Sequence, residues 1–285
     1  MIDIHTHVLY HWEKEHLTER KLLEKMDSLG IEKFVVLPII GPEVPYYYFG
    51  TEDVLRVHER HPERVIPFCN IDPRAGKNSP ETDFSPLIDK YREAGCRGLG
   101  ELTANLYIDD PLCLNLFRQC GEAGLPVLFH LYDRFGGSYG LVDDMKLPRL
   151  ENALKKCENT VFIGHAMAFW SEISADTDDA TRGGYPKGPV KKPGRLQELF
   201  ERYPNLYGDI SAGSGYNALA RDRDYGYEFM EKYSGRLLFG TDLCHPVQET
   251  PIVEYMREAL RNRMISREAY DRIASANAKN LLGIK

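Results

Sequence analysis

Short apolar runs alternate along this chain with segments in which apolar residues recur every three or four positions. The runs are typical of buried β-strands, and the segments between them are typical of amphipathic helices. None of the runs alternates apolar with polar residues, which indicates strands covered on both faces and therefore a parallel sheet. The eight expected strands are 2–7, 34–40, 65–71, 96–102, 126–131, 161–166, 205–211 and 236–241.

Several helix boundaries can be read from single residues. The side chain of Thr18 can cap the first helix, and Gly30 can end it. Pro86 and Pro111 each stand where a helix begins, a position at which the missing N–H costs nothing. Eight parallel strands with helices between them are enough to close a barrel. The sequence therefore predicts an α/β fold, a (β/α)8 TIM barrel, as a single domain over residues 1–285 without a linker or an internal repeat.

One segment interrupts the alternation of strands and helices. Residues 166–194, after the sixth expected strand, are too many for a simple connection and include several glycines and prolines. Long loops in compact domains are usually functional or disordered. We interpret this segment as a lid over the mouth of the barrel, the alternative being a surface insertion without a role.

Composition narrows the classes of function. The net charge of −7 argues against nucleic acid as a partner, because phosphate binding requires a basic surface. No apolar run is long enough to span a bilayer, and the first residues do not read as a signal peptide. The six cysteines include no Cys-x-x-Cys pair, which suits a reducing compartment. We expect a cytoplasmic protein that acts on a small molecule, with no nucleic acid or membrane partner. The sequence leaves open whether it forms a homo-oligomer.

Polar residues stand at the ends of the expected strands. His5 and His7 lie two positions apart in the first strand, so their side chains point to the same side. Two neighbouring imidazoles are half of a metal site. In barrels of this kind the reactive groups lie at the C-terminal ends of the strands. Four other strands end in residues that can complete the site, namely Glu101, His130, His165 and Asp242.

Each of these residues has an ordinary explanation when it is taken alone. A histidine at the end of a strand can be a core residue with satisfied hydrogen bonds, Glu101 can pair with an arginine, and Asp242 can cap a helix. Their convergence changes the interpretation, because burying so many polar groups without a common partner costs several kcal/mol. A divalent cation is a partner that offsets this cost for all of them.

The order of these residues resembles the amidohydrolase superfamily. The pattern is His-x-His at positions 5–7, then Glu101, His130, His165 and Asp242, with the closing segment Asn-Ala-Lys-Asn-Leu-Leu-Gly at 277–283. The chain is most similar to the amidohydrolase-related group of TIM-barrel metal-dependent hydrolases, which also contains decarboxylases and lactonases.

The resemblance implies a ligand set. His5, His7 and Asp242 would hold the more buried metal. His130 and His165 would hold a second metal, or in a one-metal member His130 would be a ligand and His165 would contact the substrate. Glu101 would bridge two metals where other members use a carbamylated lysine. One or two divalent ions are expected, zinc first, with manganese and iron as alternatives.

The resemblance also implies a reaction. A metal-activated water would attack an ester, lactone or amide carbon, with Asp242 moving the proton and His165 orienting the substrate or stabilising the oxyanion. Because decarboxylase-like relatives usually lack an acidic residue at the position of Glu101, that residue favours hydrolysis. A metal-dependent decarboxylase on the same scaffold is the alternative, and a catalytically silent metal-binding protein is a third hypothesis.

Loops after the strands supply candidate substrate contacts. They are rich in aromatic, hydroxyl and amide groups, which suits a small polar ring compound, sugar-derived or aromatic, with a carboxylate for Arg134 or Arg221. Surface loops are commonly rich in such residues for other reasons. The expected contacts are Trp12, Tyr107, Tyr132, Arg134, Trp170, Tyr216, Arg221 and His245.

Overall fold

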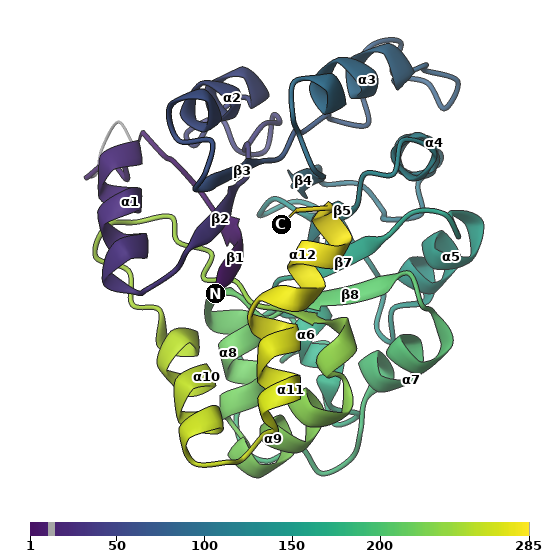
Figure 1. The fold of residues 1–285 in the computed structure, drawn as a ribbon. Helices are drawn as coiled ribbons and strands as arrows, with labels where there is room; N and C mark the ends of the chain where they lie inside the picture. Colours follow the sequence, from purple (N-terminus) through teal and green to yellow (C-terminus); the bar gives the residue numbers. More distant parts are fainter. Residues whose placement is uncertain (11–14, 285) are drawn as a thin grey trace.

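The barrel strands are all parallel and follow one another around a closed cylinder (Figure 1). The computed structural model describes residues 1–10 and 15–284. The barrel strands are β1 (Ile2–Thr6), β2 (Lys33–Val36), β3 (Val65–Pro67), β4 (Leu99–Leu102), β5 (Val127–Tyr132), β7 (Phe162–His165), β8 (Leu206–Asp209) and β9 (Leu237–Leu238). Each falls inside or overlaps one of the eight expected runs, and the predicted TIM barrel is correct.

Backbone hydrogen bonds close the cylinder at two places where the strands are short. Between β3 and β4, the N–H of Cys69 donates to the oxygen of Gly98 at 2.9 Å. Between β1 and β9, the N–H of Ile4 donates to the oxygen of Phe239 at 2.9 Å, and the N–H of Asp242 donates to the oxygen of His5 at 2.8 Å. The first and last barrel strands are therefore paired, so their C-terminal ends open on the same rim.

The interior of the barrel is filled by apolar side chains and is closed at the N-terminal end of the strands. Alternate residues of the strands, such as Ile4, Ile66 and Leu128, form one buried cluster. Ala278 and Leu282 of the C-terminal helix α12 (Asn277–Leu282) belong to the same cluster. Helix α12 crosses the end of the barrel at which the N-terminus lies (Figure 1). The closing segment thus plugs the N-terminal end, and the opposite end carries the polar residues.

An outer layer of helices surrounds the strands, with a second and larger hydrophobic core between the two layers. Thr18 caps the first helix as expected, because its hydroxyl accepts from the N–H of Lys21 at 3.4 Å. Asp110 caps the helix that starts at Pro111 by accepting from the N–H of Leu112 at 2.8 Å.

The helices are α1 (Glu19–Ser28), α2 (Thr51–Arg60), α3 (Ser85–Glu93), α4 (Pro111–Glu122), α5 (Pro148–Lys156), α6 (Met167–Trp170), α7 (Arg195–Arg202), α8 (Ala212–Ala220), α9 (Arg223–Lys232), α10 (Pro251–Arg261) and α11 (Arg267–Asp271). Three short helical segments of other types are η1 (Ser171–Ile173), η2 (Ser234–Arg236) and η3 (Arg272–Ala276).

The segment 166–194 begins inside the molecule. It opens with α6 and η1, and the side chain of Trp170 is buried and donates from Nε1 to the oxygen of Asp209 at 2.7 Å. The two ends of the segment are joined, since the N–H of Gly194 donates to the oxygen of Ile173 at 3.0 Å. The segment is therefore anchored to the barrel at its base, and its role as a lid stays a prediction.

A ninth strand was not expected from the sequence. Strand β6 (Leu141–Val142) pairs in parallel with the end of β5, where Leu131 faces Leu141. It extends the sheet beyond the rim on the side of His130. Two residues are too few for a hydrophobic pattern to indicate a strand.

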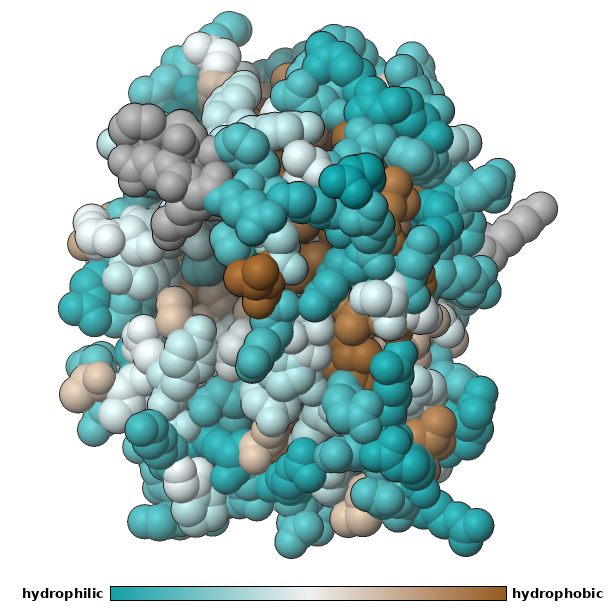
Figure 2. Space-filling model, turned by 90° about the vertical axis from the view of Figure 1, so that its left-hand side faces the viewer, coloured by the Kyte–Doolittle hydropathy of each residue, from teal (hydrophilic) through white to brown (hydrophobic). Residues whose placement is uncertain are grey.

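The face shown in Figure 2 is mostly hydrophilic, and hydrophobic residues reach it only in separate patches. Among the described residues, no helix has the length and apolar character needed to cross a membrane. All six cysteines are free thiols.

Candidate metal centre

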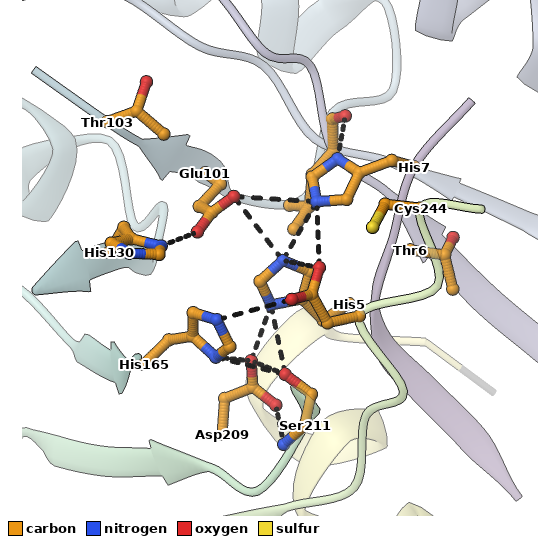
Figure 3. Close-up of polar contacts among 12 residues, drawn as sticks. His5, Thr6, His7, Glu101, Thr103, His130, His165, Asp209, Ser211 and Cys244 are labelled. Atoms are coloured by element: carbon orange, nitrogen blue, oxygen red, sulfur yellow. Dashed lines mark hydrogen bonds and ion pairs between the residues drawn. The ribbon is translucent and has the colours of Figure 1, made fainter. Parts of the chain in front are cut away.

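The two N-terminal histidines face each other at the rim of the barrel (Figure 3). Nε2 of His5 lies 3.1 Å from Nε2 of His7, and both rings are buried. Oδ1 of Asp242 lies 3.3 Å from Nε2 of His5 and 3.4 Å from Nε2 of His7. Three ligand atoms from strand ends far apart in the sequence thus form a compact triangle.

The hydrogen bonds behind the two rings decide which of their nitrogens carry protons. Nδ1 of His7 lies 3.2 Å from the carbonyl oxygen of Leu37, which can only accept, so this nitrogen must donate. Nδ1 of His5 lies 2.7 Å from the carboxylate of Asp209 and donates in the same way. In the neutral tautomers both Nε2 atoms then present lone pairs to each other and to Asp242. Such a cluster of lone pairs fits a cation. A backbone carbonyl or a carboxylate behind the ring is also the usual partner of a metal-binding histidine.

Glu101 and His165 border the same point. Oε2 of Glu101 lies 3.6 Å from Nε2 of both His5 and His7, and Nε2 of His165 lies 3.7 Å from Oδ2 of Asp242. His5, Glu101 and His165 form a second group whose ligand atoms lie within 4.8 Å of one another. Both groups share His5, which has only Nε2 to offer. One lone pair binds one ion, so these two groups can surround one shared metal ion.

His130 stands beside this set in contact with Glu101, and its role as a metal ligand stays a prediction. Its Nδ1 lies 2.8 Å from Oε1 of Glu101, and its ring packs edge to face against that of Tyr139. His130 therefore holds Glu101 in place, leaving Oε2 of that carboxylate turned toward the two N-terminal histidines (Figure 3).

Asp209 is the functional residue that sequence reasoning missed. It ends β8 and is completely buried, and its Oδ2 lies 2.7 Å from Nδ1 of His5 and 3.1 Å from Nδ1 of His165. The hydroxyl of Ser211 donates to the same oxygen at 2.7 Å. The signal that identified the other site residues, a polar side chain at the end of a strand, was present at Asp209 as well.

Charges within the cluster shift one another's pKa. Burial alone would lower the pKa of His5, but the carboxylates of Asp242 and Asp209 raise it well above its ordinary value. Burial would raise the pKa of Asp209, but the rings of His5 and His165 hold it below its ordinary range. A cation at Nε2 of His5 would replace the proton on that ring, so metal binding is expected to release protons.

Close backbone packing supports the ligands. A Cβ on Gly100, which has φ +143°, would lie 2.4 Å from the backbone oxygen of Leu128. A Cβ on Gly240 would lie 2.7 Å from Oδ1 of Asp209 and 3.2 Å from Cβ of His5. Asp242 has φ +51°, a strained conformation for a residue with a side chain, of a kind that concentrates at functional sites.

A cavity of about 340 Å³ opens above the metal ligands. His7, Glu101, His130 and Asp242 form its floor, with Thr103 close by. The remaining lining residues are Leu9, Ile39, Val44, Tyr47, Tyr139, Cys244 and His245. The volume is in the range of small-molecule sites.

Comparison with known proteins identifies the family. The model of a family described as amidohydrolase matches residues 2–284. The chain belongs to the amidohydrolase family. This confirms the resemblance drawn from the strand-end residues. Comparison with curated proteins finds no matching sequence.

Solved structures with this amidohydrolase fold include proteins named for different reactions. An amidohydrolase from Burkholderia multivorans with bound HEPES has a TM-score of 0.63 at 14% identity, covering 100% of this chain and 99% of that one. A probable 2-pyrone-4,6-dicarboxylic acid hydrolase from Acinetobacter baumannii, with citric acid bound, has a TM-score of 0.60 at 13% identity and covers 99% of both chains. A 5-carboxyvanillate decarboxylase from Novosphingobium aromaticivorans, complexed with manganese and a nitrobenzoic acid ligand, has a TM-score of 0.56 at 15% identity, covering 93% of this chain and 80% of that one. These likenesses show the fold and leave the reaction open.

The expected substrate contacts of this amidohydrolase fall in different places. His245 lines the cavity above the ligands, and Trp12 lies outside the described residues. Trp170 is buried within the segment 166–194, and it lines, together with Arg221, a second and much smaller cavity. The other four do not line the main cavity: Tyr107 stacks under Arg149, Tyr132 ends β5, Arg134 is exposed and paired with Asp133, and Tyr216 packs on Tyr255.

Proposed function

We propose that this protein is a metal-dependent hydrolase that uses one divalent cation to cleave an ester, lactone or amide bond of a small molecule. The observation that carries the proposal is the triangle of His5, His7 and Asp242, whose ligand atoms lie 3.1 to 3.4 Å apart in the floor of a cavity. Family membership supports metal-dependent chemistry at this rim.

The donor atoms suit zinc or manganese. Imidazole nitrogens favour zinc and other borderline metals, and carboxylate oxygens also accept manganese. When bound, the cation supplies Lewis acidity and makes a water acidic enough to attack at neutral pH.

Asp242 has one oxygen for each of two tasks. Its Oδ1 faces the two N-terminal histidines, while its Oδ2 turns toward His165. Oδ2 is therefore placed to accept a proton from the attacking water and to return it to the leaving group. In the balanced step, the water oxygen forms a bond to the substrate carbon, the carbon–oxygen or carbon–nitrogen bond breaks, and the proton moves through Asp242 to the departing atom.

His165 and Glu101 have supporting roles in this proposal. Asp209 orients the ring of His165 through Nδ1, which leaves Nε2 directed at the reacting region. In the neutral ring Nε2 can accept a hydrogen bond from the substrate, and in the imidazolium form it can donate to the oxygen on which charge develops. Glu101, held by His130, contributes a second carboxylate beside the ligands.

A metal-dependent decarboxylase is the second candidate. Its support is the structural likeness to proteins named as decarboxylases, one of them complexed with manganese. On the same floor, the substrate carboxylate would leave as carbon dioxide and the proton would be delivered to carbon.

An assay in ¹⁸O-labelled water separates the hydrolase from the decarboxylase. Metal-loaded protein is given lactones, esters, amides and aromatic acids. Hydrolysis places the label in the product acid and releases no carbon dioxide. Release of carbon dioxide without label in the remaining product would overturn the hydrolase proposal. A parallel preparation of Asp242→Asn, with metal content measured, shows whether the loss of turnover comes from the proton-moving group.

A further inference from the structure

The cavity above the metal ligands has two unlike sides. Its floor is polar and consists of the ligand residues. Its outer wall is a small hydrophobic cluster of its own, separate from the cores that stabilise the barrel. Leu9, Ile39 and Val44 are the buried members of this wall, and Tyr47, Tyr139 and Cys244 pack against them. The wall comes from the loops after β1, β2, β5 and β9, so four strand ends contribute to one apolar surface.

The buried members of this wall, Leu9, Ile39 and Val44, have no polar side-chain atom, and the polar atoms beside them are the hydroxyls of Tyr47 and Tyr139 and the thiol of Cys244. The lining of the cavity is mainly apolar, so a substrate lying against this wall leaves water behind. An ion that loses its hydration shell without a paired charge or hydrogen bonds is strongly disfavoured. An apolar body of the same size gains free energy in the same place, because it removes apolar surface from water.

Two arginines near the mouth are already paired. Arg74 donates from Nη1 and Nη2 to the two oxygens of Glu43 at 2.6 and 2.9 Å, and from Nε to Asp72 at 2.8 Å. Arg134 donates to Asp133 at 2.6 Å and is turned to solvent. Within residues 1–10 and 15–284, no arginine or lysine lines the cavity, and His245 is the one imidazole of its lining outside the floor.

We propose that the substrate has one polar reacting group and an otherwise uncharged, apolar body, such as an aryl or alkyl ester or lactone without an additional carboxylate. The proposal rests on the hydrolase function proposed above and names the substrate class of the same site. The polar group lies on the floor at the metal ligands, and the body lies against the wall of Leu9, Ile39 and Val44. A body of one ring or two fused rings suits a cavity of about 340 Å³.

Paired metal-chelating ligands test the substrate class without requiring turnover. Calorimetry with metal-loaded protein compares benzohydroxamic acid with its para-carboxy analogue, which differ only by a charge at the far end of the ring. The neutral ligand is expected to bind at least about tenfold more tightly, because the charged end would face the apolar wall. Equal affinities, or tighter binding of the carboxylated ligand, would overturn the proposal. Failure of both ligands to bind would overturn it as well, since the floor would not then anchor a polar group.

A pair of variants tests whether the preference for the neutral ligand arises at the apolar wall. Tyr47→Lys places an ammonium group in the cavity lining, and it is expected to reduce the preference for the neutral ligand at least about fivefold. Tyr48→Lys is the control, because Tyr48 is 66% exposed and does not line the cavity. An unchanged preference in Tyr47→Lys contradicts the assignment. If that variant does not fold, the relative affinities of the two ligands for the unmodified protein still test the proposed substrate class.

Hydrolysis assays separate this proposal from the proposed function. Dihydrocoumarin and a carboxylated dihydrocoumarin are compared as substrates of the same metal-loaded protein. Hydrolysis that favours the carboxylated lactone overturns the substrate class and leaves the hydrolase proposal standing. Absence of hydrolysis for both lactones, together with tighter binding of the neutral hydroxamate, overturns the hydrolase proposal and leaves the apolar substrate body supported.

Discussion

Oδ2 of Asp209 lies 2.7 Å from Nδ1 of His5, and the same oxygen lies 3.1 Å from Nδ1 of His165. One buried carboxylate therefore fixes the tautomer and the ring plane of two imidazoles at once. The backbone N–H of Ser211 donates to the other oxygen of Asp209 at 3.0 Å, so the carboxylate is itself held from the strand end. Partners of this kind orient ligating histidines and raise their basicity.

Replacing Asp209 by asparagine is expected to weaken metal binding about 10- to 100-fold, because the amide is neutral and its NH2 group must face either the two rings or the N–H of Ser211. Competition with a chromogenic chelator measures the affinity. Asp178→Asn is the control, since the exposed Asp178 accepts hydrogen bonds within its own turn, from Thr181. Unchanged metal affinity in Asp209→Asn would show that the ring orientations do not depend on this carboxylate.

The protein is expected to hold one divalent ion per chain at saturation, because His5 has a single lone pair to offer and lies in both candidate ligand groups. Elemental analysis of dialysed protein measures the stoichiometry. His7→Ala should reduce it well below one, whereas His16→Ala, on an exposed residue beside Tyr10, should leave it unchanged. Two tightly bound ions per chain would contradict the single-site geometry.

Gly100→Ala is expected to destabilise the fold by at least about 3 kcal/mol, since the added Cβ clashes with backbone at a positive φ. The nearest atom to that Cβ is the oxygen of Leu128, at 2.4 Å. Urea unfolding measures the change. Gly235→Ala is the matched control, because a Cβ there meets no atom within 4 Å and needs no left-handed conformation. Equal stabilities of the two variants would show that β4 and β5 can separate at little cost.

Glu19 joins the first two helices and should make stability depend on pH in the acid range. Nε of Arg60 donates to its Oε1 at 2.9 Å, and Nε2 of His61 lies 2.6 Å from the same oxygen. The hydrogen bond with Arg60 lowers the pKa of Glu19 below its ordinary value. The unfolded chain then binds this proton more readily, so the contribution of Glu19 is complete above the unfolded pKa of about 4.3. It is lost as the pH falls through the lower folded pKa.

Glu19→Gln should therefore cost up to about 1 kcal/mol at pH 7, the range of partly exposed ion pairs. The difference from the unmodified protein should shrink as the pH falls below about 4. Urea unfolding at a series of pH values checks this. Glu24→Gln serves as the control, because Glu24 pairs with Arg20 on an exposed face of the same helix. A difference that grows toward low pH would contradict the sign of the effect.

The local pattern of the sequence determined the elements and the chemistry available at their ends. Apolar runs and helical periodicity identified the barrel, because strands buried on both faces and helices buried on one face impose those patterns. The two-residue spacing of His5 and His7 placed both rings on one side, since that is the period of a strand. The C-terminal ends of parallel strands share one rim, so the position of Glu101, His165 and Asp242 at strand ends was enough to expect them near the pair.

The tertiary structure alone decided how these groups are used. The nitrogen that each ring leaves for a cation depends on contacts with Asp209 and the backbone of Leu37, and such contacts join residues too far apart in the sequence to leave a local pattern. The same holds for the cavity. Arg134 and Arg221 read as substrate contacts from their places in loops, but the fold turns the first to solvent beside Asp133 and puts the second in a separate cavity. The direction in which a loop side chain points is set by what packs behind it, and that packing exists only once the barrel has closed.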